Sequence, residues 1–160
     1  MIKQFKFRLE QVLRYRATVR EMRHRALADL EAQLVRERQV LADLLGLKAE
    51  ILGELALLQA SAFAAGERAL YESYLDWMGI ELDRERKTLE ELETLRETKR
   101  QELVAAQQDV KAVERLKERQ RTAYAGDVGR MEQGLLDEVA NGAFVRALRE
   151  AGDGLPKGRG

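Results

Sequence analysis

Apolar residues recur every three or four positions along two long stretches of this chain, with a single break between them. The first stretch has Leu27, Leu30, Leu34, Leu41, Leu44, Ile51, Leu55 and Leu58. The second has Leu75, Met78, Leu82, Leu89, Leu92, Leu103, Ala106, Val110 and Val113. A heptad pattern of this kind keeps one narrow apolar seam facing a partner helix. Because the break at residues 61–66 is short, the sequence predicts an all-α antiparallel two-helix coiled-coil hairpin.

We predict the ends of the helices from the positions of glycine and proline and from the points where the heptad pattern stops. We expect one domain over residues 1–140, with helices over 5–60 and 67–125 and the connection over 61–66. Gly126 and Gly129 weaken the second helix, so a separate short helix is expected over 130–140. After Asn141 the glycines and the single proline, Pro156, indicate a flexible tail over 141–160.

The first turns of the first helix show a different apolar stripe from the rest. It consists of Val12, Tyr15, Val19, Met22 and Ala26. The later stripe starts from Leu27 and Leu30, so the sequence predicts a phase shift of about one residue near this point. A shift of this kind locally unwinds a coiled coil.

Composition excludes several function classes. The chain of 160 residues has no cysteine, which rules out disulfide scaffolds and cysteine-based zinc sites. Its longest uncharged piece, residues 55–66, is far shorter than the roughly 20 residues that span a bilayer. His24 is the only histidine and is flanked by arginines, so we interpret it as a solvated surface residue. No phosphate loop or catalytic triad is present, and we expect no enzyme activity, cofactor or metal.

The net charge is zero, but the amino-terminal end is basic. Residues 1–25 hold eight lysines and arginines against two glutamates, whereas residues 76–102 are richer in acids. Three interpretations of the basic end are open: binding of nucleic acid, contact with anionic lipid, and docking to an acidic or ring-shaped protein. A solvated helix face is the alternative without function, although the acids are too few to pair most of the arginines.

A cluster of aromatic and apolar side chains follows the connection. Leu70, Tyr71, Tyr74, Leu75, Trp77, Met78 and Ile80 lie within eleven positions, and one seam accounts for only Tyr71, Leu75 and Met78. Exposed aromatic groups are favoured as binding anchors. The alternative is that Phe63 and a folded-back connection cover them.

Three segments together resemble the FliJ family of flagellar export proteins. FKFRLEQVLRYR (residues 5–16) is similar to the family's start, and LYESYLDWM (residues 70–78) to its segment after the turn. VERLKERQRTAY (residues 113–124) with MEQGLLDEVA (residues 131–140) is similar to its carboxy-terminal signature, although Gly134 stands where lysine is expected.

The resemblance implies a fold similar to the central stalk of rotary ATPases and a role in type III protein export for the bacterial flagellum, and hence in motility. It implies docking into the hexameric export ATPase ring, contact with the membrane export gate, and escort of export chaperones. The chain is then expected in the cytoplasm, peripheral at the inner face of the cell membrane, and monomeric when alone. The alternatives are an injectisome stalk of the same architecture, or a basic rod that binds membrane or nucleic acid.

Two surfaces are expected to carry these contacts. The ATPase ring contact is expected at Phe5, Phe7, Leu9, Leu13, Arg14, Arg16, Arg20 and Arg23. The export gate contact is expected at Tyr71, Tyr74, Leu75, Trp77 and Met78.

Overall fold

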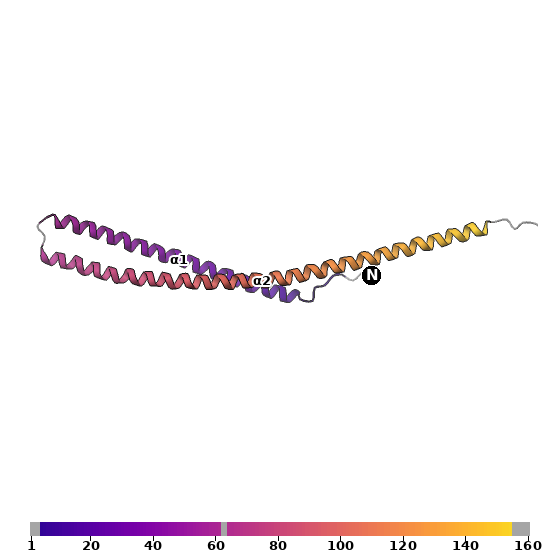
Figure 1. Cartoon of the computed structure of the whole chain (residues 1–160), viewed down its shortest axis with the longest axis horizontal. Helices are drawn as coiled ribbons and strands as arrows, with labels where there is room; N and C mark the ends of the chain where they lie inside the picture. Colours follow the sequence, from indigo (N-terminus) through magenta and orange to yellow (C-terminus); the bar gives the residue numbers. More distant parts are fainter. Residues whose placement is uncertain (1–3, 62–63, 155–160) are drawn as a thin grey trace, which may run out of the picture. The chain divides into compact units, whose positions relative to one another are not determined.

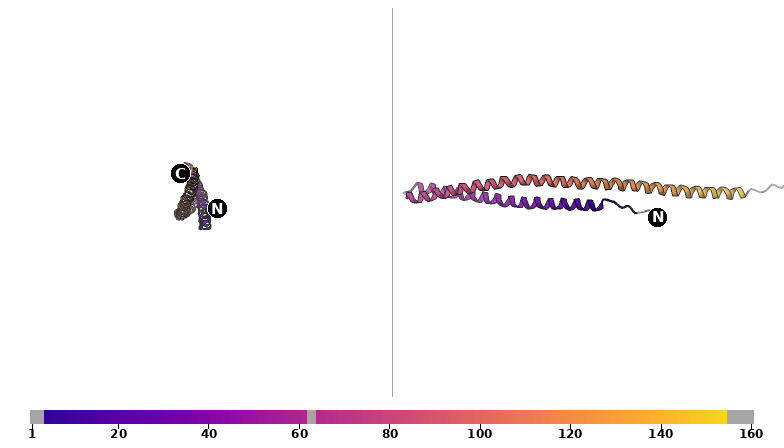
Figure 2. Two further views of the ribbon diagram at one scale, coloured as in Figure 1. Left: turned by 90° about the vertical axis from the view of Figure 1, so that its right-hand side faces the viewer. Right: turned by 90° about the horizontal axis from the view of Figure 1, so that it is seen from below.

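Two long helices make up the described chain, as the sequence predicts. The computed structural model describes residues 4–61 and 64–154. Helix α1 spans Glu10–Gln59 and helix α2 spans Ala65–Asp153. They lie side by side and run in opposite directions (Figures 1 and 2). The expected all-α helical hairpin is confirmed, and no strand occurs in this part of the chain.

The contacts divide the chain into two units. The hairpin unit comprises Arg14–Val110, and the terminal unit combines Met1–Leu13 with Lys111–Gly160. The hairpin unit is one continuous stretch of the sequence, whereas the terminal unit combines its two ends. Each unit is described by itself below.

The core of the hairpin unit is the predicted seam. The fully or nearly buried side chains are Leu30, Leu34, Ile51, Met78, Leu82, Leu89, Leu103, Ala106 and Val110. On α2 a row at every seventh residue is at least half-buried: Leu75, Leu82, Leu89, Arg96, Leu103 and Val110. Repetition at seven residues keeps this row against α1 along the whole unit.

The early stripe of the first helix is wrong as a seam except at Val19, which is partly buried. Tyr15 and Met22 are 66% and 65% exposed, whereas Ala17 and Arg20 are partly buried. Small Ala17 permits close approach, and the aliphatic stem of Arg20 covers apolar surface while its charged head stays in water. The residues of α1 that face α2 therefore recur at every seventh position, as Arg20, Leu27 and Leu34. A search for apolar residues alone omits Arg20 from this row.

Both ends of the connection differ slightly from the expectation. The chain leaves α1 through tightened turns, in which Ala60 N–H donates to Leu57 O at 3.3 Å and Ser61 N–H to Leu58 O at 3.2 Å. Such bonds satisfy carbonyl groups that the end of a helix leaves unpaired. Helix α2 then begins at Ala65, two residues before the predicted start. Phe63, which the alternative interpretation placed over the aromatic cluster, lies outside the described residues.

The expected break in the second helix is absent. Helix α2 passes through Gly126 and Gly129 and continues to Asp153, so residues 130–140 form no separate helix and residues 141–153 form no tail. A glycine lowers helix stability by about 1 kcal/mol without forbidding helical backbone, and the alanines and leucines around it favour helix. The predicted tail over 155–160 lies outside the described residues.

Candidate functional site

The amino-terminal segment packs against α2 before the first helix begins. Helix α1 starts at Glu10, five residues later than expected, because the preceding segment packs through its aromatic rings. Phe7 is only 8% exposed, and the ring of Phe5 lies tilted against the ring of Tyr124, with 5.6 Å between the two centroids. The Lys117 ammonium lies 5.9 Å from the centroid of the Phe7 ring and donates to Glu10 at 2.7 Å. These aromatic contacts hold the segment of the terminal unit in place of helical hydrogen bonds.

This packing separates the apolar residues predicted for the ATPase ring. Phe7 is buried, which removes it from any exposed contact surface, while Phe5 and Leu13 are partly buried. Leu9 remains 37% exposed. The apolar part of the predicted surface is therefore mostly engaged within the molecule.

The four arginines of the predicted ring contact fall into two pairs. Arg16 donates to Asp109 at 2.7 Å and Arg23 donates to Glu102 at 2.8 Å, so both hold α1 to α2. Arg14 and Arg20 form no ion pair with any residue in 4–61 or 64–154. Sequence reasoning missed this division because it depends on which α2 residue faces each arginine.

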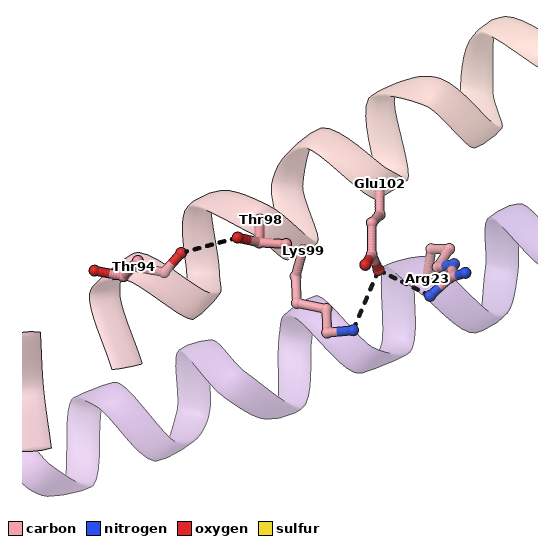
Figure 3. A network of polar contacts seen from close by, with 5 residues as sticks. All are labelled: Arg23, Thr94, Thr98, Lys99 and Glu102. Atoms are coloured by element: carbon pink, nitrogen blue, oxygen red, sulfur yellow. Dashed lines mark hydrogen bonds and ion pairs between the residues drawn. The ribbon is translucent and has the colours of Figure 1, made fainter. Parts of the chain in front are cut away.

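A small polar network surrounds the second of these pairs (Figure 3). Glu102 accepts hydrogen bonds from Arg23 of α1 and from Lys99 of its own helix, the latter at 3.2 Å. One turn earlier, Thr98 Oγ1 donates to the Thr94 carbonyl at 3.3 Å. Of these contacts, the charge-assisted bond from Arg23 to Glu102 joins α1 to α2, and Lys99 holds the Glu102 carboxylate from its own helix.

Two carboxyl groups meet inside the seam. Glu85 is partly buried, and its Oε1 has no hydrogen-bond partner among the described residues. The pKa of Glu85 is raised above its usual value, mainly because burial disfavours the charged form. A hydrogen bond with Glu37 and the negative charge of Glu37 raise it further. On the exposed acidic part of α2 the opposite occurs, since hydrogen bonds from Arg100 lower the pKa of Glu97.

The aromatic residues predicted for the export gate divide into exposed and buried groups. Tyr74 and Trp77 are 39% and 48% exposed, and their rings stack at 5.6 Å. Leu75 is partly buried and Met78 is fully buried in the seam, so Met78 supports this surface from beneath. Tyr71 is partly buried.

A groove adjoins the exposed aromatic pair. It has a volume of about 400 Å³ and is lined by Ile51 and Glu54 of α1 and by Leu70, Tyr71 and Tyr74 of α2. A groove with apolar walls and one carboxylate suits an apolar side chain of a partner protein that lies next to a polar or cationic side chain. The sequence showed the α2 residues of this groove, but the contribution of α1 depends on the helix pairing.

The described residues hold no group of three or more His, Cys, Asp or Glu side chains arranged to bind a metal ion. Within the same ranges, no helix combines the length and apolar character that crossing a membrane requires.

Comparison with known protein families identifies the family of this chain. Residues 5–149 match the family described as "Flagellar FliJ protein". No curated protein and no solved structure matches the chain. The family match covers most of the sequence and includes all three segments on which the resemblance depends. The chain therefore belongs to the FliJ family and is a component of the flagellar protein export apparatus.

Proposed function

We propose that this protein is the coupling stalk of the flagellar type III export apparatus. In this role it docks into the hexameric export ATPase ring, links that ring to the membrane export gate and escorts export chaperones. The protein would work in the cytoplasm at the inner face of the cell membrane, through protein contacts alone. The match to a flagellar family favours this function over an injectisome stalk and over a lipid- or nucleic-acid-binding rod.

The observation that carries the ring contact is the pair of unengaged cations at the start of α1. Arg14 and Arg20 have no counter-ion among the described residues, whereas Arg16 and Arg23 are held by α2. Unpaired guanidinium groups speed association with an acidic partner and align it. The inner wall of an ATPase ring that receives this helix is therefore expected to present carboxylates.

The test measures ATP hydrolysis by the purified export ATPase against increasing concentrations of this protein. The Arg14→Glu/Arg20→Glu variant should need about tenfold more protein for half-maximal stimulation, because two attractive contacts become repulsive. The effect should weaken as salt rises, since exposed charges are screened.

A matched control changes the same charge elsewhere in the hairpin unit. Arg36 and Lys87 are exposed and, like Arg14 and Arg20, form no ion pair with the described residues. Arg36→Glu/Lys87→Glu should stimulate as the parent does. Equal stimulation by Arg14→Glu/Arg20→Glu and the parent would refute the ring contact.

The exposed aromatic pair is the proposed contact with the export gate. Tyr74 and Trp77 present a stacked apolar surface beside the groove of Ile51, Glu54 and Leu70. Aromatic side chains next to a groove are frequent anchors of protein interfaces. Met78 and Leu75 are assigned to support of this surface because they are buried or partly buried.

The gate contact is tested with the cytoplasmic part of the gate protein. Tyr74→Ala/Trp77→Ala should weaken binding in titration calorimetry by about tenfold or more and reduce swimming in soft agar. ATPase stimulation should be unchanged. Leu57→Ala/Leu95→Ala removes two other exposed side chains of the hairpin unit and is the control. Normal gate binding by the aromatic variant would exclude this surface.

A further inference from the structure

The last part of α2 is a helix without a partner helix among the described residues. Every side chain from residue 129 to residue 154 is exposed. Seven large apolar groups are among them: Met131, Leu135, Leu136, Val139, Phe144, Val145 and Leu148. This segment, drawn in yellow-orange in Figure 1, belongs to the terminal unit.

Three of these apolar residues form one stripe together with Val128, which precedes them on α2. Val128, Met131, Leu135 and Val139 follow one another at three- and four-residue steps, which places them on one face of the helix. We call this face the C-terminal stripe. Met131, Leu135 and Val139 are 55%, 61% and 66% exposed, while Val128 is partly buried.

The stripe continues an interface that already exists on the same helix. Within the terminal unit, Val113, Lys117 and Tyr124 are partly buried at heptad-like spacing, and the step from Tyr124 leads to Val128. A surface with this spacing is shaped to receive side chains of another helix. At Lys117 and Tyr124 the existing interface is covered by the non-helical segment of Phe5 and Phe7. The regular three- and four-residue spacing of the stripe itself suits an amphipathic helix.

The charges beside the stripe determine which helix fits. Residues 126–140 hold four acids and one basic residue, Arg130. Arg130 is bonded to Asp127, and Asp137 accepts a hydrogen bond from Gln133 at 3.3 Å. Glu132 and Glu138 border the stripe and have no bonding partner among the described residues. Two unengaged carboxylates beside an apolar face favour a cationic partner.

The backbone of the same segment is poorly suited to stand alone. It contains Gly126, Gly129, Gly134 and Gly142, and no neighbouring atom lies within 4 Å of the position that a Cβ would take at any of them. Glycine is the weakest helix former after proline, and packing usually supplies the stability that propensity lacks. A partner that packs on the stripe would supply it here.

We propose that the C-terminal stripe is a docking surface for a basic amphipathic helix of a partner protein, and that the partner stabilises the end of α2. The apolar face of the partner covers Met131, Leu135 and Val139, and its lysines or arginines meet Glu132 and Glu138. The stripe shares no residue with the surfaces of Arg14 and Arg20 or of the aromatic pair, so the proposal does not rest on the proposed function.

Charge argues against two other occupants. A second copy that used the same stripe would bring Glu132 and Glu138 close to the same acids of its partner, and like charges repel. An anionic membrane is disfavoured for the same reason.

The experiment uses the full chain and two labelled synthetic peptides. Both peptides are amphipathic helices with the same leucine positions, one with lysine and the other with glutamate on its polar face. Fluorescence anisotropy should show the lysine peptide binding at least about tenfold more tightly than the glutamate peptide, with affinity falling as salt rises. Amides of residues 126–142 should exchange hydrogen more slowly when the lysine peptide is bound.

Three variants distinguish binding at the C-terminal stripe from non-specific electrostatic attraction. Leu135→Asp should weaken binding of the lysine peptide about tenfold or more, because it replaces a covered apolar group by a charge. Glu132→Lys/Glu138→Lys should reverse the preference between the two peptides. Leu57→Asp, at a side chain that is 77% exposed in the hairpin unit, should change neither affinity.

Several results would overturn the proposal. Equal binding of both peptides, or unchanged binding by Leu135→Asp, would exclude a specific basic helix. Light scattering that shows a dimer of the parent and a monomer of Leu135→Asp would assign the stripe to a second copy instead. Sedimentation with anionic vesicles that depends on Leu135 would assign it to a membrane.

Discussion

At the scale of single residues, the polar interruptions of the seam have different physical roles. Arg20 covers apolar surface with its stem, and Lys99 joins Arg23 in binding Glu102. Glu85 differs because Glu37 is a second acid and one of its own oxygens has no hydrogen-bond partner among the described residues. This carboxyl group therefore costs stability when it is ionised.

Replacing this carboxylate should stabilise the hairpin. Glu85→Gln removes the charge and adds a donor beside Glu37, so the free energy of unfolding at pH 7 should rise by about 1 kcal/mol. Urea denaturation followed by circular dichroism measures the change. Glu81→Gln is a poor comparison because Glu81 pairs with Arg84. Glu91→Gln, at an exposed position without an ion pair in the described chain, is the control and should have little effect.

The same residue gives the parent a specific pH dependence. The pKa of Glu85 is raised in the folded state, so protonation of Glu85 favours folding. This contribution to the free energy of unfolding is fully present below the usual glutamate pKa of about 4.3 and is lost as pH rises through the raised pKa. The advantage of Glu85→Gln over the parent should therefore be largest at neutral pH and shrink toward pH 4. An advantage that does not vary with pH would contradict this explanation.

At the scale of elements, the heptad pattern was sufficient to predict the helical hairpin but not the residues at which its helices begin and end. The pattern from Leu27 to Val110 predicted the seam because leucine at heptad spacing has no other place to be buried. The start of α1 was misjudged because the apolar pattern does not show that Phe7 is buried beside Lys117 of α2 before the helix begins. The end of α2 was misjudged because glycine weakens a helix without setting its limit.

The candidate surfaces show a similar division. The sequence identified Tyr74 and Trp77 and the arginine-rich start, because unusual residue types are visible without coordinates. It did not show which arginines are engaged, since Arg16 and Asp109 are 93 positions apart. It also treated Tyr15 and Met22 as seam residues, because the apolar pattern of one helix cannot show which face its partner covers.

Two glycines of α1 offer a test at the same scale. Gly46 and Gly53 lie inside α1, and a Cβ added at either position would meet no atom within 4 Å. Gly46→Ala/Gly53→Ala should raise the free energy of unfolding by about 1–2 kcal/mol, because alanine favours helix and no contact is strained. Urea denaturation measures this. Loss of stability would indicate that these positions lie against a surface that the structure does not contain.

At the scale of the whole molecule, stability is concentrated where two helices cover each other. Among the residues that the structure describes, nine buried core side chains belong to the hairpin unit and one, Phe7, belongs to the terminal unit. Hydrogen exchange should therefore be slow for amides between residues 82 and 106 and fast for amides between 131 and 153. Mass spectrometry of peptic fragments measures both. Equal protection of the two ranges would mean that an additional contact covers the end of α2.

A core substitution should separate these regions further. Leu82 is 2% exposed, and Leu82→Ala should lower the free energy of unfolding by about 2–5 kcal/mol through lost packing and a residual cavity. Because the seam of the hairpin unit is formed jointly by both helices, exchange should accelerate together in residues 27–58 of α1 and 75–110 of α2. Exchange in residues 131–153 should not change, since no described contact connects these amides to the cavity. Leu136→Ala, at a side chain 64% exposed, is the control and should alter neither region. If Leu82→Ala accelerated exchange in α2 alone, the two helices would unfold separately, and the hairpin could not act as one rigid coupling element.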